Sequence, residues 1–207
     1  MTVFVLTFFT FMLLILFAAL FNFSTVFVDY GRAGNIAQQA SLAATREVYA
    51  AIEEAMDQYD LAQWAKEVPN PVEPKVNAME KILRASHPDW ADSEVRFAAM
   101  DEVLSSELPG NAELLVFVEA KLIAARGDIR NTVATILEEN GAVLSGSEVI
   151  LVNERERIEV RTSVRYQSDT FGFPFLKAYA EQVHQEGESR RIGFAGDIGW
   201  YGYTITY

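Results

Sequence analysis

The chain has 207 residues, of which 50% are hydrophobic and 22% charged, and its 29 acidic and 17 basic residues give a formal net charge of -12. This length suits one ordinary domain with an appendage. The acidic balance argues against nucleic acid as a partner, because phosphates require clustered Lys and Arg. The absence of Cys excludes disulfide bonds, thiolate zinc sites and a cysteine nucleophile, and it leaves the redox compartment open.

Residues 1–28 form an apolar run without a single charged side chain or His. The run is long enough to span a bilayer, which needs about 20 apolar residues. It lacks the basic start and the small-residue cleavage site of a secretory signal, and no Lys or Arg precedes it to orient a plain signal anchor. One way to reconcile these facts is that Met1 is already a processed terminus, a basic leader having been removed upstream of it. The phenylalanines of the run are interpreted as lipid-facing or core-packing side chains.

The sequence continues from this run without a helix breaker until Pro69. Small residues recur there at steps of three and four, which is typical of one helix face: Ala33, Ala37, Ala40, Ala44, Val48, Ala51 and Ala55. The pattern predicts one helix from near residue 2 to about residue 66, roughly 95 Å long. We expect such a helix to be too long to bury itself in a domain of this size. It would have to share its surface with a membrane, a partner helix or copies of itself.

Helices are also predicted for the segment that follows the prolines at positions 69, 71 and 74. Residues 75–86 and 89–107 carry helical apolar patterns, the second with Asp89 or Asp92 as the N-cap. A third helix would begin after Asn111 and stop at Gly127, and a fourth would be capped by Asp128 and end at Gly141. Residues 114–118, LLVFV, also fit a strand.

The period changes after Gly141. Apolar residues alternate with charged ones from Ile158 to Tyr166, which predicts a half-buried strand. Residues 148–152 would pair with it across a turn at 153–156, and 189–195 and 198–207 are further candidate strands. The predicted fold class is therefore α+β and pilin-like: a very long N-terminal helix, apolar in its first half, carries a small head of short helices packed on an antiparallel sheet. The segments are 1–28 (apolar helix), 29–68 (its amphipathic continuation), 69–141 (helical part of the head) and 142–207 (sheet part).

No catalytic constellation is visible in the sequence. His87 and His184 lack ligand spacing around them, and no P-loop, EF-hand, GxSxG or HExxH motif occurs. The acidic residues 53, 54, 57 and 60 are interpreted as a solvated face, with a weak calcium site as the alternative. The glycines at 193, 196, 199 and 202 indicate turns and close backbone approach. We expect no enzyme activity, no cofactor and no resident metal ion.

One stretch resembles a known family. At VDYGRAGNIAQQASLAATREVYAAI, directly after the apolar run, the sequence is similar to the TadE-like pilins of tight-adherence (Tad/Flp) type IV pilus systems. The resemblance consists of an Asp-aromatic-Gly-Arg step, here Asp29, Tyr30, Gly31 and Arg32, followed by an Ala- and Gln-rich amphipathic helix. The stretch from residue 156 to 195 is also similar, with a strand, a hydrophobic loop containing Pro174 and a returning strand. The middle of the chain carries no such likeness.

The sequence departs from the pilin pattern at position 5. Type IV pilins commonly carry a Glu there, which neutralises the terminal amine of a neighbouring subunit in the apolar core, whereas this chain has Val5. An uncompensated charge in such a core would be costly. Either Met1 is not the mature terminus, or the buried amine is handled differently.

The resemblance implies a structural subunit of an extracellular, pilus-like filament that serves adhesion. The implied partners are copies of itself in a helical filament, the cytoplasmic membrane before assembly, and the pilus assembly machinery. The residues expected to pack in the membrane and then in the filament core are Val3, Phe4, Val5, Phe8, Phe11, Leu14, Ile15, Phe17, Ala18, Phe21, Val26 and Phe27. Two alternatives stay open: a minor or tip pseudopilin of a Tad-type pilus, and a single-pass anchored extracytoplasmic binding module.

Overall fold

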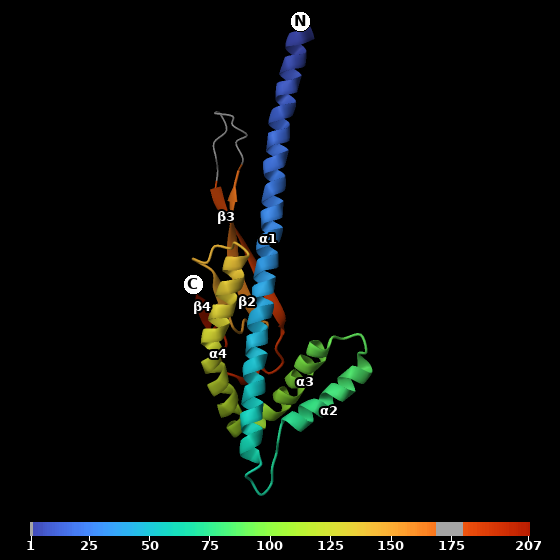
Figure 1. Ribbon diagram of the computed structural model, residues 1–207, viewed down its shortest axis with the longest axis vertical. Coiled ribbons are helices and arrows are strands. Elements are labelled where there is room, and N and C mark those ends of the chain that lie inside the picture. Colours follow the sequence, from blue (N-terminus) through green and yellow to red (C-terminus); the bar gives the residue numbers. More distant parts are fainter. Residues whose placement is uncertain (1, 169–179) are drawn as a thin grey trace.

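One helix, much longer than the others, carries the rest of the chain as a head near its C-terminal half (Figure 1). The structure, a computed structural model, describes residues 2–168 and 180–207. Within these residues the head contains three further α-helices and a four-stranded antiparallel sheet, which confirms the α+β class. The elements are α1 (Thr2–Gln63), α2 (Glu73–Ser86), α3 (Asp92–Glu107), η1 (Leu108–Gly110), α4 (Ala112–Glu139), β1 (Glu148–Ile150), β2 (Arg157–Gln167), β3 (Ala180–Arg191), η2 (Ala195–Asp197) and β4 (Thr204–Thr206).

Helix α1 is continuous over 62 residues, which confirms the prediction of one helix from near residue 2 to about residue 66. It passes through Gly31 and Gly34 without a break, because isolated glycines cost a helix only about 1 kcal/mol each. Its two halves have different surroundings. Residues 2–17 are all exposed, whereas a continuous stripe from Ala33 to Gln63 is buried.

The head covers the C-terminal half of α1, so the expectation that this helix could not bury itself within the chain is wrong for that half. The small residues of the predicted stripe are the covered ones, and Ala37, Ala40 and Ala44 are each 0% exposed. Strand β3 crosses them so closely that a Cβ atom at Gly187 would lie 2.3 Å from the carbonyl carbon of Ala37. The stripe serves close packing of the head onto its own helix.

Helix α4 lies antiparallel to this half of α1. The start of α4 lies beside the end of α1, where Gln63 Nε2 donates to Glu113 Oε2 over 3.2 Å. Its end lies near the middle of α1, where Arg32 Nη2 donates to the carbonyl oxygen of Asn140 over 2.6 Å. The buried side chains of α4 recur at every third or fourth position and pack between the two helices: Leu114, Val118, Leu122, Ala125, Ile129, Val133 and Leu137.

The prediction of two helices over 111–127 and 128–141 is wrong, because α4 runs unbroken through Gly127 and Asp128. The apolar seam against α1 continues on both sides of Gly127, and its burial outweighs the modest helix cost of one glycine. The strand alternative for LLVFV is wrong for the same reason. The predicted ends hold: the Asn111 side chain accepts from the Leu114 amide over 3.0 Å, and Gly141 follows the helix with a φ of 75°.

Helices α2 and α3 form a hairpin beside the C-terminal half of α1 (Figure 1). They lie close to the predicted ranges 75–86 and 89–107. The N-cap of α3 is Ala91 instead of Asp89 or Asp92, and the Glu94 side chain accepts from the Ala91 amide over 3.0 Å. The Glu94 carboxylate thereby accepts from the backbone amide of the N-cap residue, which would otherwise bond to water.

Three of the acidic residues 53, 54, 57 and 60 attach the head to α1, and their interpretation as a solvated face is wrong for Asp60, whereas Glu53 is partly exposed and Glu54 is exposed. Asp60 is 8% exposed and accepts from the backbone amides of Val72 (2.7 Å) and Glu73 (2.8 Å), capping α2 from a distance. Glu53 pairs with Arg96 and Glu54 pairs with Lys121. Only Asp57 of this group is exposed without an ion pair in the described part of the chain.

A buried polar cluster joins α1, α3 and the segment after β3. The Tyr49 hydroxyl donates to Asp101 Oδ1 over 2.7 Å, and the Gly193 amide donates to the same oxygen over 3.1 Å. Arg190 Nη2 donates to Asp101 Oδ2 over 2.8 Å. Burial raises the pKa of Asp101 above its usual value, and its three donors act in the opposite direction.

The sheet has the strand order β3-β2-β1-β4, with every pairing antiparallel. The predicted strand at 158–166 and the turn at 153–156 are confirmed by β2 and the connection that precedes it, and the predicted partner at 148–152 is confirmed over Glu148–Ile150, the extent of β1. Asn153 shapes that turn, because its Oδ1 accepts from the amides of Arg155 (2.9 Å) and Arg157 (3.1 Å). Val160 and Val164 of β2 are buried, on the face that α1 covers (Figure 1).

The last two strands differ from the prediction. β3 covers Ala180–Arg191 instead of 189–195, and β4 covers only Thr204–Thr206 of the predicted 198–207. Residues 198–203 instead form a turn that packs on α4, with the Arg126 guanidinium 3.9 Å from the centre of the Tyr203 ring. The Tyr207 hydroxyl donates to the Arg130 carbonyl over 2.9 Å, and burial raises the pKa of Tyr207 to about 12.

Candidate functional site

The largest exposed apolar surface lies on the first half of α1. We call residues 2–28 the exposed apolar segment. Residues 2–17 are exposed all round the helix, and Phe4 is 79% exposed and Phe17 63% exposed. Neighbouring rings contact along the helix, as in the edge-on pair Phe23 and Phe27 with centroids 5.0 Å apart. A contiguous apolar surface of this size marks a site for a membrane or another protein.

Four of the six polar side chains of the exposed apolar segment bond to their own helix. The hydroxyls of Thr7, Thr10 and Thr25 donate to the carbonyl oxygens four residues earlier over 2.9, 2.9 and 3.0 Å. The Asn22 side chain donates to the Ala18 carbonyl over 3.2 Å. These groups therefore need no water, and the segment suits a hydrocarbon or a helix-packed environment.

Most of the residues predicted to pack in a membrane or filament core are exposed in the single chain: Val3, Phe4, Val5, Phe8, Phe11, Leu14, Ile15, Phe17, Phe21 and Phe27. Two of the predicted residues differ. Ala18 is 5% exposed and Val26 is half-buried, on the same side of α1 as Asn22, whose carbonyl oxygen lies 3.4 Å from the Tyr166 hydroxyl. They are therefore shielded surface within the chain and do not add to its exposed apolar area.

The Asp-aromatic-Gly-Arg step lies where α1 enters the head. Arg32 binds the end of α4 through the Asn140 carbonyl, and Tyr30 is 54% exposed. Gly31 is exposed, and a Cβ atom placed on it would meet no atom within 4 Å. Nothing within the described chain therefore requires a glycine at this position.

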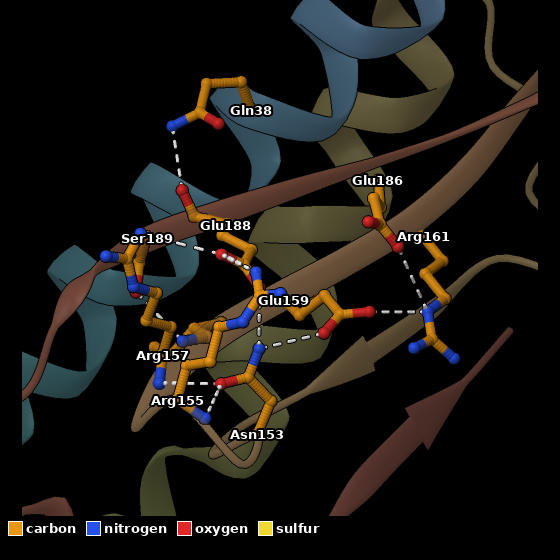
Figure 2. Close-up of polar contacts among 10 residues, drawn as sticks. Gln38, Asn153, Arg155, Arg157, Glu159, Arg161, Glu186, Glu188 and Ser189 are labelled. Atoms are coloured by element: carbon orange, nitrogen blue, oxygen red, sulfur yellow. Dashed lines mark hydrogen bonds and ion pairs between the residues drawn. The ribbon is translucent and has the colours of Figure 1, made fainter.

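A second candidate site is a polar hollow of ≈ 690 Å³ on the face of the sheet that points away from α1. Figure 2 shows its side chains, which come from β2, β3 and the turn between β1 and β2. Asn153 lies at its centre and donates to Glu159 Oε2 over 2.9 Å and to Glu188 Oε1 over 3.0 Å. Arg161 pairs with Glu159 over 2.5 Å and with Glu148 over 2.9 Å.

The hollow is therefore lined by an ion-pair network with an excess of carboxylates, since four Glu and two Arg side chains line it. Glu188, the carboxylate nearest to the turn, pairs with Arg155 over 3.3 Å and with Arg157 over 3.6 Å. In the described parts of the chain, no three acidic or His side chains gather in a way that could hold a metal ion. His87 stacks on Trp90 with ring centroids 4.0 Å apart, and His184 is exposed on β3, so the structure does not bring the two histidines together.

Sequence reasoning missed the residues that attach the head to α1. Gly187 and Asp101 act through partners that lie 150 and 52 residues away in the chain, and no local pattern marks such pairs. The glycine within the otherwise polar strand segment EQVHQEGESRR is the one available signal, since glycine in a strand often marks close backbone approach. The hydrophobic loop with Pro174 lies outside the described residues.

Helix α1 is the one helix among the described residues that is long and apolar enough to cross a membrane. This is consistent with anchoring in a membrane through the exposed apolar segment. No protein-family model, curated protein or solved structure matches the chain. The function must therefore be argued from the geometry of α1 and its head.

Proposed function

We propose that the chain is a structural subunit of an extracellular, pilus-like filament, which polymerises through the exposed apolar segment of α1. The supporting observation is that α1 continues from this segment into the head as one unbroken helix. No linker separates the apolar half from the half that the head covers. Each copy therefore presents its apolar segment at a fixed position relative to its head, and a regular polymer requires such a fixed relationship.

Burial of the exposed apolar segment drives the assembly. Removing apolar surface from water stabilises by about 25 cal/mol per Å², and a fully buried Phe or Leu side chain contributes roughly 1.5–3 kcal/mol. The cytoplasmic membrane provides this burial before assembly, and the helices of neighbouring copies provide it in the filament core. The pilus assembly machinery would move the subunit between these two environments.

The geometry of the contact generates a helical polymer. The apolar segment projects from one end of the molecule and the head lies at the other (Figure 1), so two copies meet through different surfaces. A heterologous contact of this kind extends into a filament unless it closes into a ring. The acidic heads would face outward, and Arg46, which is exposed, is available for an ion pair with a neighbouring copy. The resemblance of residues 29–32 to TadE-like pilins supports the same function.

A single charge within the exposed apolar segment tests the proposal. Val5→Lys places an ammonium group in the filament core, where an unpaired charge is strongly unfavourable. We expect this variant to form no filaments while the head stays folded, as judged by thermal unfolding of the detergent-solubilised chain. Val116→Lys is the matched control, because Val116 is a valine of the head that is 65% exposed, and it should polymerise normally. Normal filaments of Val5→Lys would overturn the proposal.

An anchored extracytoplasmic module is the second candidate function. It is favoured by the length of the apolar part of α1, since residues 2–21 measure about 30 Å and match the hydrocarbon thickness of a bilayer. Such a module would stay in the membrane fraction and form no polymer. Small amounts of the chain in filaments built from another protein would instead favour a minor or tip pseudopilin.

A further inference from the structure

The hairpin of β2 and β3 extends beyond the rest of the sheet, along α1 toward its N-terminus (Figure 1). β1 pairs with β2 only between Glu159 and Arg161, whereas the pairing of β2 with β3 continues to Gln167 opposite Ala180. The extension is therefore a ribbon of two strands. A two-stranded ribbon is marginally stable by itself, so another element must support it.

Helix α1 supports the ribbon at the level of the exposed apolar segment. Tyr166 is 6% exposed, and its hydroxyl oxygen lies 3.4 Å from the carbonyl oxygen of Asn22. The shielded residues of α1 follow steps of three and four on this side of the helix: Ala18, Asn22, Thr25, Val26, Asp29 and Ala33. The last described residues of the ribbon thus lie beside the last turns of the apolar segment.

This position limits how much of α1 can lie in hydrocarbon. Arg165 and Gln167 alternate with Tyr166 along β2 and are exposed, on the side away from α1. A charged side chain is strongly disfavoured within a bilayer core, so the hydrocarbon must end before these residues. Residues 2–21 precede the level of Asn22 and measure about 30 Å, which is one hydrocarbon thickness. The headgroup layer then coincides with the end of the ribbon.

The side chains at the end of the ribbon have the charge and polarity expected of residues in the lipid headgroup layer. Arg165 forms no ion pair within the described part of the chain, although most of the other arginines of this acidic protein do. Cationic side chains near a membrane surface are attracted to anionic lipid headgroups. Tyrosine is enriched at the same depth, because its ring is apolar and its hydroxyl is polar.

We propose that the end of the β2–β3 hairpin, residues 165–168 and 180–182, lies among phospholipid headgroups while the chain is anchored in a membrane. This contact adds a second attachment point beside α1 and fixes the orientation of the head relative to the membrane. The inference rests on the anchored state of the proposed subunit and does not depend on polymerisation. A failure to form filaments would leave it standing.

The absence of cysteine from the chain makes site-directed fluorescence a direct test. Gln167→Cys places a unique thiol at the end of the ribbon, and Glu154→Cys places one in the exposed turn at the other end of β2. The eleven residues of β2, about 35 Å, separate the two positions. Each full-length variant is labelled with an environment-sensitive fluorophore and inserted into vesicles of phosphatidylcholine and phosphatidylglycerol. The vesicles carry a nitroxide quencher on the lipid headgroup, and Phe11→Cys with a quencher in the acyl chains reports insertion of α1.

We expect the headgroup quencher to remove most of the fluorescence at position 167 and little at position 154. Arg165→Glu should weaken the quenching at position 167 in these anionic vesicles, whereas Arg46→Glu, a charge reversal far along α1, should leave it unchanged. Equally weak quenching at 167 and 154, with Phe11→Cys quenched by the acyl-chain label, would overturn the proposal. A lack of quenching at Phe11→Cys would also overturn it, because α1 would then not be inserted.

Discussion

Gly187 of β3 and Ala37 of α1 lie in direct backbone contact, so that a Cβ atom on Gly187 would lie 2.3 Å from the carbonyl carbon of Ala37 and 2.6 Å from its oxygen. No side chain fits between the strand and the helix at this point. The contact brings the sheet close enough to α1 for Gln38 Nε2 to donate to the Glu188 carbonyl over 3.0 Å. One glycine thus determines how closely the head packs on the helix that carries it.

Gly187→Val should therefore substantially lower the free energy of unfolding of the head. Its neighbours are backbone atoms that cannot rotate away, so the cost should approach the upper end of the range for overpacking, about 3 kcal/mol. For a chain of this size that lowers the Tm by roughly 6–12 °C, measured by circular dichroism of the full chain in detergent. Gly199→Ala serves as control, since a Cβ at Gly199 meets no atom within 4 Å. An unchanged Tm for Gly187→Val would contradict the close contact.

Removing the carboxylate of Asp60 should destabilise the start of α2. Asp60→Ala leaves the amides of Val72 and Glu73 without their acceptor, which costs about 1–2 kcal/mol by comparison with other helix caps. Asp57→Ala removes an exposed carboxylate from the same helix and should change the Tm little. Hydrogen exchange of the Val72 and Glu73 amides would show the loss directly. Equal protection of these amides in both variants would count against the capping role.

Asp101 should give the stability of the chain a distinct pH dependence. Burial raises the pKa of this carboxyl in the folded state, so between the folded pKa and the unfolded value near 3.9 the folded chain binds more protons than the unfolded chain. The free energy of unfolding contributed by Asp101 therefore rises as the pH falls through this window. The difference in Tm between the natural chain and Asp101→Asn should shift in favour of the natural chain as the pH is lowered from 7. A shift in the opposite direction would mean that Tyr49, Gly193 and Arg190 outweigh burial.

A substitution at Gly31 tests whether neighbouring copies pack closely next to the exposed apolar segment. Gly31→Leu has room in the single chain and replaces a poor helix former, so the helix should gain stability of about 1 kcal/mol. If neighbouring copies pack closely at the Asp29–Arg32 step, the same variant should lose its filaments. Gly127→Leu is a matched control on α4, another helical glycine whose Cβ would meet no atom within 4 Å. Filaments that form equally well with both substitutions would exclude close packing at Gly31.

The sequence predicted those parts of the fold that depend on local patterns. The long helix, the strand over residues 158–166 and the turn around Asn153 follow from periodicity and turn chemistry, and the structure extends the strand by one residue at each end. The errors concern long-range packing. Gly127 reads as a helix stop, but the seam of α4 on α1 continues through it. β3 shows almost no apolar alternation and was therefore missed over most of its length. Its position depends on its pairing with β2 and on the contact of Gly187 with α1.

The candidate site was predictable in position but not in detail. Ten of the twelve residues named from the apolar run are exposed, as a surface that packs against a membrane or other copies requires. Ala18 and Val26 could not be separated from them by composition, because only the position of the hairpin shows which side of α1 is shielded. The attachment of Asp60 to α2 likewise depends on a turn that returns the chain to α1.

Negative-stain electron microscopy of sheared extracellular material from cells that express the full chain tests the filament proposal most directly. Mass spectrometry of the same sample identifies the subunit and its N-terminal residue. We expect filaments composed mainly of this chain. A chain that remains in the membrane fraction, with no filament containing it in quantity, would contradict the filament proposal and favour an anchored extracytoplasmic module.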